Sequence, residues 1–507
     1  MASELCAGPL SCTYENGFLR TIKHGDREIL RMIYFALRDE NWGTYPIQIK
    51  HEHLQVFDNS FKINYDAFHE RDQQLIYHWR VAITGDESGT ITFDIKGTAL
   101  VDILKNRVGF CVLQPLSGVA GAACTILHSN GKVEQSAFPE LVAPENPFHD
   151  VTALHWTSYG VACELNFKGE VFETEDQRNW TDASFKTFCT PLSIPFPVQL
   201  KQGTGVHQRI SFYAKPADIE VRDNSVTEVR DSVNHKIQLG VGASTETDLL
   251  SDASVQLLRA LQLSHYRLEV EPATSRWKEQ FRKDCHHARL LQLPLEIVLT
   301  LSLEYQKELS SFLEEAKLLA PHIKFILLLG QSKSTPQYII DECVPQLRST
   351  CVGVKIGGGT NYNFTELNRN RFNSSNLDFI SFSIHPQEHA FDDLSILETV
   401  ESYASVISSA RQIYPGKAVH ISPLTLRKRF NPNATELSKQ KLSNAEKADP
   451  RQALDFCAEF TTLALQELHR CGVESVSIFQ TAGRQGLLDA DTPHPVYHSL
   501  LKLRMLF

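Results

Sequence analysis

The stretch LEIVLTLSLEYQKELSSFLEEAKLLAPHIKFILLLG, residues 295–330, decides the fold. It opens with an apolar run over 295–301 and closes with a second apolar run over 324–329. Between them, over 303–320, apolar residues recur with the spacing of one helix face. Two buried strands joined by a helix form a βαβ unit, in which the strands are parallel. The stretch therefore predicts a parallel sheet covered by helices.

Similar strand-like runs recur on both sides of this stretch. The predicted strands are Ile237–Gly242, Tyr266–Val270, Leu295–Leu301, Lys324–Leu329, Cys351–Ile356, Phe379–Ile384, Ala418–Ser422 and Ser475–Gln480. The first five start about 28 residues apart, the length of one βαβ unit. An open doubly wound sheet also alternates strands and helices, but eight such units close naturally into a ring. We therefore predict a C-terminal (β/α)8 TIM barrel over residues 236–507.

Residues 1–235 follow a different pattern. Short segments there alternate between apolar and polar residues or are rich in β-branched residues, as in Phe61–Tyr65, Ile76–Ile83, Thr90–Ile95, Ala162–Phe167 and Gln208–Tyr213. Turn signals such as Asn130-Gly131 separate them. Period-two alternation between turns is typical of antiparallel strands. We predict an N-terminal β-sandwich-like domain over residues 1–235, so that an all-β domain precedes the α/β domain.

Composition excludes several classes of protein. The 507 residues include 50 Lys and Arg and 60 Asp and Glu, a formal charge of −10, which disfavours nucleic-acid binding. The longest apolar runs, such as 325–329, are too short to cross a bilayer. The first residues lack a basic segment followed by an apolar stretch, and the 11 cysteines show no CxxC spacing. We therefore expect a cytoplasmic protein with reduced thiols and neither a nucleic-acid nor a membrane partner.

Polar side chains gather where the predicted barrel strands end, which is where barrel enzymes carry their active sites. The polar residues at these strand ends are Glu269, Glu271, Asn361, Glu366, Asn368, His385, Gln387, His389, Thr425, Arg427, Arg429 and Gln480. Such groups make directional hydrogen bonds to hydroxyls, which suits a sugar-like ligand. We predict Glu366 and His385 as catalytic groups, because carboxylates and imidazoles move protons. The predicted substrate-binding residues here are Asn368, Arg427 and Gln480.

Other interpretations of these residues stay open. Glu366 would also suit a solvated loop or a helix start, and His385 would also suit a hydrogen-bonded structural role. A metal site formed by His385, His389 and Asp392 is a further alternative. Pro386 disfavours a helix continuing from residue 385, so the spacing does not ensure that both imidazoles face one ion. We expect no metal.

One segment of the first domain is dense in charged and aromatic residues: FETEDQRNWTDASFKTFCTP, residues 172–191. A solvated strand edge rarely interleaves charges and aromatic rings so tightly. We predict that this segment folds over the barrel mouth, with Glu175 and Asp182 as catalytic carboxylates. Its predicted substrate-binding residues are Asn179, Trp180 and Lys186. The alternative is an interdomain seam of salt bridges.

Motifs of several hydrolase classes are missing. The sequence has no GxSxG, and so no α/β-hydrolase elbow, and no HExxH. Two-carboxylate glycoside cleavage fits poorly, because strand eight offers Gln480 where a second acid would stand. Strand four ends in Leu329-Gly330-Gln331, without an Asn-Glu pair.

Several motifs together resemble the D-apionate lactonase family. They are EDQRNWTDASFKT (175–187), GGGTNYNFTELNRNR (357–371), FSIHPQEHAFDD (382–393), SPLTLRKRFNPNAT (422–435) and the opening AGPLSCTYENGFLRTIKHGDREILRMIYFALRDENWGT (7–44). The likeness runs from about residue 5 to the end of the chain. The resemblance implies a hydrolase that opens the lactone of apionate, a branched-chain sugar acid, in apiose catabolism. Such a reaction needs no cofactor and takes a small sugar lactone as its partner.

The sequence departs from this resemblance in strand eight. Relatives resemble ETTGWRG there, whereas this chain has QTAGRQG at residues 480–486. Two alternatives to a sugar-lactone hydrolase therefore stay open. One is a glycoside hydrolase acting on small apiose-type glycosides, and the other is a catalytically impaired carbohydrate-binding relative. The sequence leaves the oligomeric state open.

Overall fold

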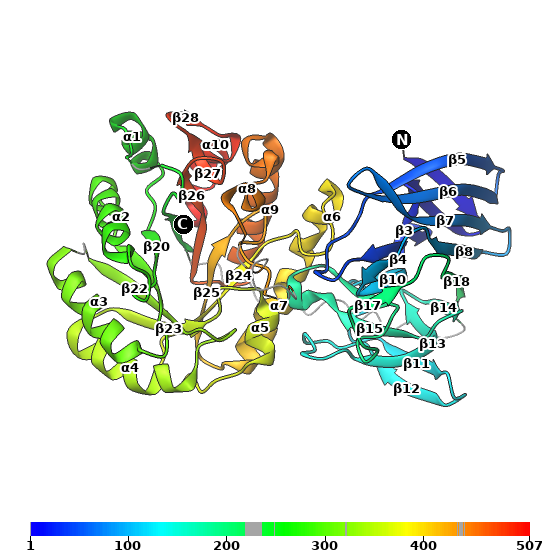
Figure 1. Cartoon of the computed structure of the whole chain (residues 1–507), viewed down its shortest axis with the longest axis horizontal. Coiled ribbons are helices and arrows are strands. Elements are labelled where there is room, and N and C mark those ends of the chain that lie inside the picture. The colour runs from blue at the N-terminus through cyan, green and yellow to red at the C-terminus, as the bar shows by residue number, and fades with distance from the viewer. Residues whose placement is uncertain are drawn as a thin grey trace. The chain divides into compact units, whose positions relative to one another are not determined.

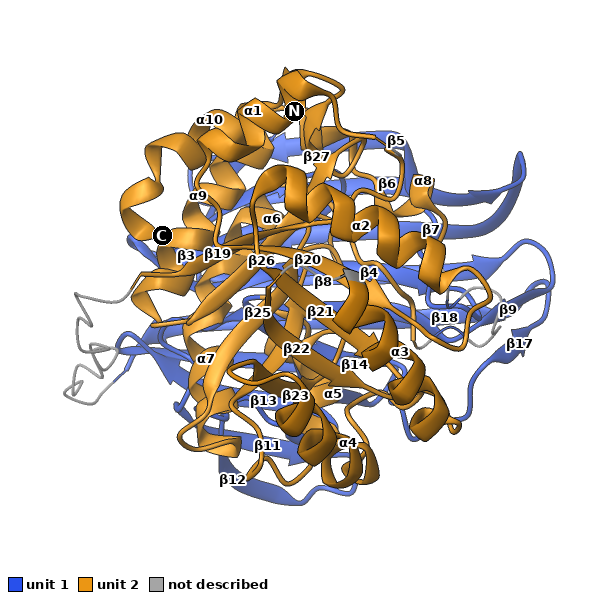
Figure 2. Ribbon diagram, turned by 90° about the vertical axis from the view of Figure 1, so that its left-hand side faces the viewer, with its two compact units in different colours: residues 1–177, 183–227, 433–440 blue, residues 178–182, 228–432, 441–507 orange. Residues whose placement is uncertain are grey.

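The computed structural model describes residues 2–217, 236–247, 249–319, 322–432, 434, 440 and 442–507. The chain forms two compact units, coloured separately in Figure 2. Unit 1 comprises residues 1–177, 183–227 and 433–440, and unit 2 comprises residues 178–182, 228–432 and 441–507. The domain boundary predicted between residues 235 and 236 adjoins a stretch, 218–235, that lies outside the described residues.

Unit 1 is built from antiparallel strands (Figure 1). The strands of its described residues are β1 (Ser3–Ala7), β2 (Leu10–Glu15), β3 (Phe18–His24), β4 (Arg27–Arg38), β5 (Ile47–Val56), β6 (Phe61–Arg71), β7 (Gln74–Gly85), β8 (Thr90–Ala99), β9 (Ile103–Lys105), β10 (Arg107–Pro115), β11 (Ala123–His128), β12 (Val133–Ala137), β13 (Phe148–Ser158), β14 (Val161–Lys168), β15 (Phe172–Asp176), β16 (Ser184–Phe188), β17 (Val198–Leu200) and β18 (Gly205–Pro216). Within these residues one 16-stranded sheet runs in the order β1-β2-β3-β4-β10-β16-β15-β13-β14-β18-β8-β7-β6-β5, with β11 and β12 branching from β13. Strands β9 and β17 pair separately.

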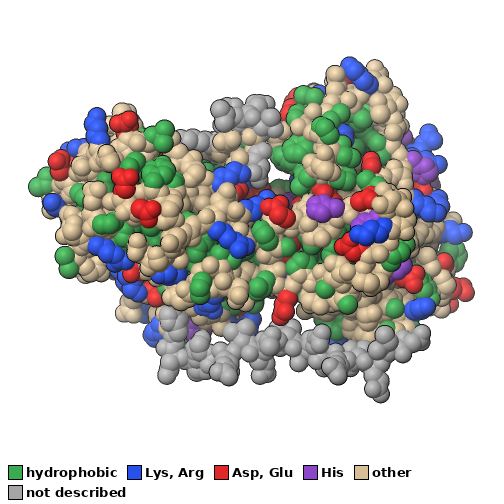
Figure 3. Space-filling view, turned by 90° about the horizontal axis from the view of Figure 1, so that it is seen from below, with side chains coloured by type: hydrophobic (Ala, Val, Ile, Leu, Met, Phe, Trp, Pro, Cys, Tyr) green, Lys and Arg blue, Asp and Glu red, His purple; other side chains and the backbone are tan. Residues whose placement is uncertain are grey.

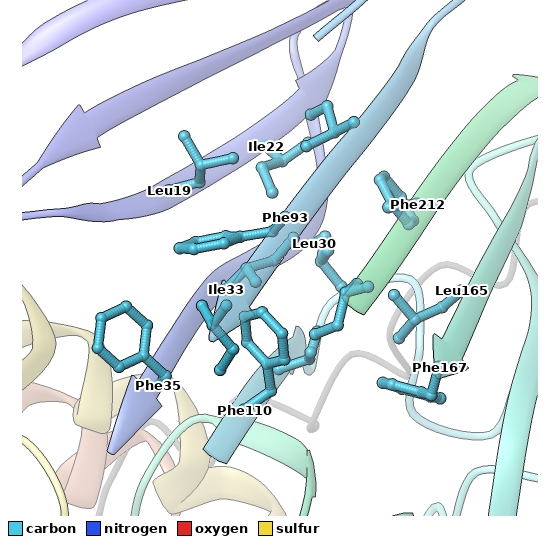
Figure 4. Packing of buried hydrophobic residues seen from close by; sticks show 14 of the residues in the cluster. Leu19, Ile22, Leu30, Ile33, Phe35, Phe93, Phe110, Leu165, Phe167 and Phe212 are labelled. Carbon is cyan, nitrogen blue, oxygen red and sulfur yellow. The ribbon is translucent and has the colours of Figure 1, made fainter. Parts of the chain in front are cut away.

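The core of unit 1 forms where distant parts of this sheet face each other. Along β6, residues 61, 63 and 65 are buried while 62 and 64 are exposed, as the alternation of apolar and polar residues predicts. The ring of Phe35 in β4 lies 4.9 Å from Trp79 in β7 and 6.2 Å from Phe93 in β8, centroid to centroid. These strands are not neighbours in the sheet, so the rings meet across the core. Figure 4 shows Phe35 and Phe93 among the buried side chains of this core. The predicted β-sandwich-like architecture is confirmed.

Unit 2 contains the predicted barrel. Its parallel strands are β19 (Gln238–Gly242), β20 (His265–Val270), β21 (Leu295–Thr300), β22 (Ile323–Leu329), β23 (Lys355–Gly359), β24 (Phe379–Ile384), β25 (Ala418–Leu424) and β26 (Ser475–Ala482). They pair in sequence order, and β26 pairs with β19 to close the ring. The (β/α)8 barrel predicted from the sequence is therefore confirmed.

Except for η1, which lies between β15 and β16 in the chain, the helices, 3-10 turns and short strands all follow strands of the barrel. Its described helices are α1 (Asp252–Ala260), α2 (Trp277–Leu291), α3 (Tyr305–Leu319), α4 (Gln337–Thr350), α5 (Phe364–Arg369), α6 (Asp393–Glu398), α7 (Tyr403–Ile413), α8 (Asn444–Lys447), α9 (Asp455–Arg470) and α10 (Pro495–Lys502), with 3-10 turns η1 (Gln177–Trp180), η2 (Thr399–Ser402), η4 (Pro450–Ala453) and η5 (Arg504–Leu506) and two added strands, β27 (Gly486–Asp489) and β28 (Thr492–Pro493). Helix α2 buries positions 277, 281, 284, 285 and 288, one face of a helix.

The fifth barrel strand lies further along the chain than the sequence predicted. The apolar run 351–356 indicated a strand followed by a glycine-rich loop, but β23 spans Lys355–Gly359 and contains the glycines. A Cβ atom on Gly359 would lie 1.9 Å from the backbone oxygen of Ser381 in β24. The strand therefore needs glycine there because its neighbour approaches too closely for any side chain.

Two observations concern the surface and the helices of the described residues. Lys and Arg are interspersed with Asp and Glu on the face shown in Figure 3. Within the described part of the chain, no helix is both long enough and apolar enough to cross a membrane.

Candidate functional site

A cavity of about 220 Å³ lies within unit 2, at the C-terminal ends of β19, β20, β25 and β26. Its lining includes Arg267 and Glu269 from β20, Asp284 from α2, Arg429 and Phe430 after β25, and Gln480 from β26. Pockets for drug-sized ligands measure roughly 300–1,000 Å³, so this cavity fits a smaller ligand. Its place at the strand ends is where barrel enzymes carry their active sites.

Glu269 is the centre of a hydrogen-bond network at this cavity. Its Oε1 accepts hydrogen bonds from Arg429 and from the amide of Asn361, the latter at 3.5 Å, and pairs with Arg267 at 2.9 Å. Within the described part of the chain, no residue donates to its Oε2, and the side chain is 33% exposed. Oε2 is therefore the oxygen that Glu269 presents to a ligand.

Both arginines are fixed by further contacts with the ends of other barrel strands. Arg267 donates from Nε to the Ser422 hydroxyl at 2.7 Å and from Nη2 to the Asn361 side-chain oxygen at 3.2 Å. Arg429 donates from Nη2 to the same Asn361 oxygen and to the Asn361 backbone carbonyl, the latter at 3.3 Å. Because both guanidinium groups are planar and held at several points, the network is preorganised before any ligand binds.

The arginines also set the charge state of the carboxylate. Burial raises the pKa of Glu269, but the charges of Arg429 and Arg267 outweigh burial and hold that pKa well below its usual range. Burial lowers the pKa of Arg429 to about 10, although Glu269 opposes this change. Glu269 and Arg429 are therefore both charged at neutral pH, and the guanidinium groups of Arg267 and Arg429 beside one carboxylate leave this part of the cavity positive.

An irregularity in β26 aims Gln480 at the cavity. The pairing register of β19 with β26 shifts after Val241, so that Gly242 faces Gln480 instead of Phe479. A Cβ atom on Gly242 would lie 2.4 Å from the Phe479 carbonyl oxygen. The side-chain oxygen of Gln480 accepts hydrogen bonds from the backbone N–H and the hydroxyl of Thr245, at 3.0 and 3.3 Å. Bulges of this kind often re-aim a side chain beside an active site.

A second carboxyl group lines the same cavity from α2. Asp284 is only 2% exposed, and the Gln280 amide donates to both of its oxygens, at 3.1 and 3.0 Å. Burial raises the pKa of Asp284 to about 6, while the Gln280 hydrogen bond and the charge of Lys283 act in the opposite direction. The cavity is thus lined by two carboxyl groups in different states: Glu269 stays ionised, and Asp284 titrates near neutral pH.

His385, a predicted catalytic residue, lies after β24 beside another charge pair. Its Nε2 is 3.6 Å from Glu388 Oε2, and Lys428 Nζ is 3.2 Å from Glu388 Oε1. Burial lowers the pKa of His385 to about 4, against the effect of Glu388, so the imidazole is neutral at physiological pH. Its Nδ1 makes no hydrogen bond within the described residues.

Asp449 anchors the predicted binding residue Arg427. The Asp449 side chain is fully buried and lies 3.1 Å from Arg427 and 2.9 Å from Arg451. It also accepts a hydrogen bond from Gln387 at 2.8 Å. Burial raises the pKa of Asp449, but its hydrogen bonds with Arg451 and Gln387 outweigh burial and hold that pKa well below its usual range. This network ties the segment after β25 to the loop after β24.

Residues 178–182 belong to unit 2 and pack on the loops that follow β23 and β24. The Asn368 amide donates to the Asn179 side-chain oxygen at 3.1 Å. The Trp180 ring stands edge-on to His389, with centroids 5.3 Å apart. Three predicted substrate-binding residues, Asn179, Trp180 and Asn368, therefore lie together.

Asp182 forms a close pair with His389 in the same region. Asp182 Oδ2 lies 2.6 Å from His389 Nδ1, and the two side chains are 12% and 19% exposed. The hydroxyl of the neighbouring Thr181 donates to the His385 carbonyl at 3.3 Å. Asp182 is therefore adjacent in sequence to Thr181, which contacts His385. Both Asp182 and His385 are predicted catalytic residues.

The remaining predicted residues have partners elsewhere. Glu366 lies in α5, 3.2 Å from Lys333, and accepts a hydrogen bond from the Asn370 amide at 3.2 Å. Glu175 and Lys186 form an ion pair between β15 and β16 of unit 1. Neither arrangement tests a catalytic role for these residues, which stays a prediction.

Of the predicted catalytic and binding residues, Gln480 is the one that lines the cavity beside Glu269. The polar strand ends of the sequence also included Glu269, Asn361 and Arg429, to which no role was given. Arg267 was missed because it lies within a strand, and Asp284 was missed because α2 lies outside the ring. An acidic residue on the apolar face of residues 277–291 is the pattern that could have indicated Asp284.

The sequence left a metal site at His385, His389 and Asp392 open as an alternative. Among the residues that the structure describes, no group of three or more His, Cys, Asp or Glu side chains is placed to hold a metal ion. His385 and His389 contact different carboxylates, Glu388 and Asp182 respectively.

Comparisons with known proteins cover nearly the whole chain. A family model described as D-apionate lactonase, N-terminal domain, matches residues 1–217, and one described as D-apionate lactonase, TIM barrel domain, matches residues 239–506. The D-apionate lactonase of Brucella anthropi is 29% identical, over 96% of this chain and 83% of the relative. Among solved structures, β-glucuronidase from Ruminococcus gnavus matches at 9% identity with a TM-score of 0.36, over 91% of this chain and 69% of that one. A β-arabinopyranosidase matches at 10% identity with a TM-score of 0.29, over 83% of this chain and 64% of that one.

Proposed function

Since the chain belongs to the D-apionate lactonase family, we propose that it hydrolyses a sugar lactone, with D-apionolactone as substrate and D-apionate as product. The curated relative from Brucella anthropi carries this activity in its name. Such an enzyme would act in apiose catabolism in the cytoplasm, on a small-molecule substrate and without a cofactor.

The observation that carries the proposal is the one-sided contact pattern of Glu269. Arg267, Arg429 and Asn361 all contact Oε1, while no described residue donates to Oε2 of this cavity-lining carboxylate. A carboxylate fixed in this way is always ionised and accepts a hydrogen bond from a sugar hydroxyl or from the attacking water. Positioning of this kind lowers the barrier by holding the reactants in the reactive geometry.

The positive charge beside Glu269 suits the carbonyl of a lactone. When water adds to the carbonyl carbon, the carbonyl oxygen becomes an oxyanion, and fixed donors stabilise it more strongly than they stabilise the neutral carbonyl. Arg429 and Arg267 line the cavity and are held rigidly, so they supply such donors without reorganisation. Gln480 and Thr245 would orient the ring hydroxyls. The cavity of about 220 Å³ favours a single sugar ring over a larger glycoside.

One observation favours a second candidate function. The carboxyl groups of Glu269 and Asp284 line one cavity and have pKa values displaced in opposite directions. Such a pair is also the arrangement of a glycoside hydrolase, in which one carboxyl group donates a proton and the other attacks or activates water. The second candidate is therefore hydrolysis of small apiose-type glycosides.

A substrate comparison separates the two candidates. The full-length protein is incubated with D-apionolactone, and proton release is followed at constant pH against the spontaneous rate. A parallel set of nitrophenyl glycosides reports glycosidase activity by colour. We expect ring opening well above the spontaneous rate and no nitrophenol release. Nitrophenol release without ring opening would establish the glycosidase instead.

The arginine role is tested by Arg429→Met. Removal of one oxyanion donor costs roughly 100-fold in rate, so we expect kcat/KM for the lactone to fall by about that factor. Arg282→Met is the matched control, because Arg282 is an exposed arginine on α2 that pairs with Glu315. Equal losses in both variants would contradict the proposed role of Arg429.

The predicted residues outside this cavity remain candidates for the same reaction. Asp182→Asn and Glu175→Gln each remove one charge with little change of shape. If Asp182 and Glu175 act in the site, these variants should have a lower kcat/KM and an unchanged thermal midpoint. The same result is expected for substitutions of Glu366 and His385 if those residues act there. Loss of stability with normal activity would assign the pair Asp182–His389 to packing instead.

The impaired-relative alternative is tested at Gln480. If the wild-type chain lacked activity because it carries an amide there, Gln480→Glu would create activity. Strong turnover by the wild-type protein, which we expect, counts against this alternative.

A further inference from the structure

We propose that Asp284 is the general base of the cavity, the group that takes a proton from the attacking water and returns it to the leaving alkoxide. This assignment rests on the proposed lactone hydrolysis and adds a residue that neither the sequence nor the family likeness identifies. It starts from the placement of a buried carboxyl group on an otherwise apolar helix face.

Asp284 occupies a core position of α2. The buried side chains on either side of it along that face are Phe281 and Ala288, which cover the barrel strands. Asp284 is itself 2% exposed and lines the cavity that also contains Arg267 and Glu269. A carboxyl group at such a position costs stability unless it is paired or neutral. Its retention in the cavity wall therefore calls for a reason other than packing.

The surroundings of Asp284 differ from those of Glu366 and Asp449, two other buried acids of the barrel. Glu366 pairs with Lys333, and the side chain of Asp449 pairs with two arginines. Within the described residues no cation lies within ion-pair distance of Asp284, and its hydrogen bonds come from the Gln280 amide. An acid held by an amide alone keeps the ability to gain a proton.

The charged and titratable groups around Asp284 leave it without a cationic partner and able to gain a proton. On α2 itself, Lys283 lowers its pKa slightly and Cys285 stays a neutral thiol, because burial raises the pKa of Cys285 to about 12. On β20, burial and Asp284 itself raise the pKa of Tyr266 well above its usual range. The charged groups of the neighbouring helices bind elsewhere: Glu315 of α3 pairs with Arg282 and Lys278, and Arg259 of α1 donates to the Leu290 carbonyl.

The tyrosine next to Asp284 supplies a second observation. The Tyr266 hydroxyl is completely buried and makes no hydrogen bond within the described residues. Buried polar atoms without a partner are rare in folded proteins and call for a specific explanation. A polar group bound between Tyr266 and Asp284 would satisfy both side chains. Tyr266 itself does not line the cavity, but Asp284 does, so we infer that the cavity wall at Asp284 receives the attacking water or a ring hydroxyl.

The reaction balances with these groups alone. The water oxygen forms a bond to the lactone carbonyl carbon while Asp284 takes a water proton, and the oxyanion forms beside Arg429. The carbonyl then re-forms, the ring C–O bond breaks, and the proton passes from Asp284 to the departing alkoxide. The product is the open hydroxy acid, which releases a proton to solvent. A base with a pKa near 6 is deprotonated at neutral pH yet strong enough to take this proton, which suits the role.

The test is the pH profile of kcat/KM for D-apionolactone in full-length proteins. The wild type should lose activity below about pH 6, because protonation removes the base. Asp284→Asn should lose about 100-fold in kcat and lose this acidic limb. Gln280→Leu, which removes a hydrogen bond to the charged form, should move the limb about one pH unit higher. Glu279→Gln, which removes an exposed carboxylate on the same helix, should match the wild type.

The outcomes separate this inference from the proposed function. A wild-type protein that turns over the lactone, together with an Asp284→Asn variant that keeps the wild-type limb and rate, overturns the assignment of Asp284 alone. The assignment is also overturned if the acidic limb of the pH profile of Gln280→Leu lies at the same pH as in the wild type. This test holds even if Asp284→Asn fails to fold. A wild-type protein without turnover on the lactone overturns the proposed function and this assignment together.

Discussion

The cost of burying Asp284 gives a prediction that is independent of any substrate. Replacement by asparagine keeps the shape of the side chain and removes its titration. Because burial raises the pKa of Asp284, the folded protein binds a proton at this site more tightly than the unfolded chain does. The site therefore favours folding at acidic pH, and this contribution is lost as pH rises through the folded-state pKa.

The size of the effect follows from the two pKa values. The pKa of Asp284 rises from 3.8 to about 6, and each pH unit between them corresponds to about 1.4 kcal/mol. The wild-type protein should thus lose about 3 kcal/mol relative to Asp284→Asn as pH rises from about 4 to above 6. The asparagine also changes the hydrogen bond with Gln280, but that change does not depend on pH.

Urea unfolding of both proteins at several values between pH 4 and pH 7 measures this difference. Other titrating groups affect both proteins equally, so the pH dependence of the difference in unfolding free energy isolates Asp284. We expect the stability of Asp284→Asn relative to the wild type to increase from about pH 4 to about pH 6 and then to level off. A difference that is constant with pH would show that Asp284 has an ordinary pKa, and the reasoning from its burial would be wrong.

Two further predictions concern residues that hold the barrel and its loops in place, Asp449 and Gly359. Asp449→Asn should lower the free energy of unfolding by about 2 kcal/mol in urea unfolding at pH 7, because it leaves Arg451 and Arg427 without their buried partner. Because the pKa of Asp449 is held low, the stabilisation that its charge provides is present above about pH 4 and is lost on acidification. The unfolding free energies of wild type and variant should therefore converge at low pH. A difference between them that does not change with pH would contradict this prediction. Gly359→Ala should lower the thermal midpoint by several degrees, because its Cβ atom would lie 1.9 Å from a backbone oxygen, whereas Gly205→Ala, whose nearest neighbour is 3.7 Å away, should not. Equal midpoints for the two alanine variants would show that β23 and β24 separate easily.

The barrel was predictable because most of its strands are apolar runs bounded by helical patterns. The fifth strand is the exception, since the room for Gly357 and Gly359 is set by residues of β24 that lie 20 positions or more along the chain. A glycine run carries no periodicity, so the sequence gives no sign that it lies in a strand. The strand over residues 61–65 was predictable because apolar and polar residues alternate along it, and this local pattern alone indicates which side chains are buried.

The candidate site was predictable only in part. Strand ends located Glu269, Arg429 and Gln480, because parallel strands bring their carboxyl ends to one rim. Arg267 and Arg429 converge on a single oxygen of Glu269, and this convergence depends on the orientation of side chains. Arg429 lies 160 residues from Glu269 along the chain, in the segment after β25. The roles that the sequence assigned to Glu366 and His385 stay predictions, since both residues have partners outside the cavity.

Glu269 is the residue on which lactone hydrolysis in this cavity depends most. The deciding measurement is kcat/KM for D-apionolactone in Glu269→Gln beside the wild type, with Glu279→Gln as a control for the loss of one carboxylate. We predict a fall of about 100-fold or more for Glu269→Gln and no change for the control. Equal values for Glu269→Gln and the wild type would show that the reaction, if it occurs, takes place elsewhere.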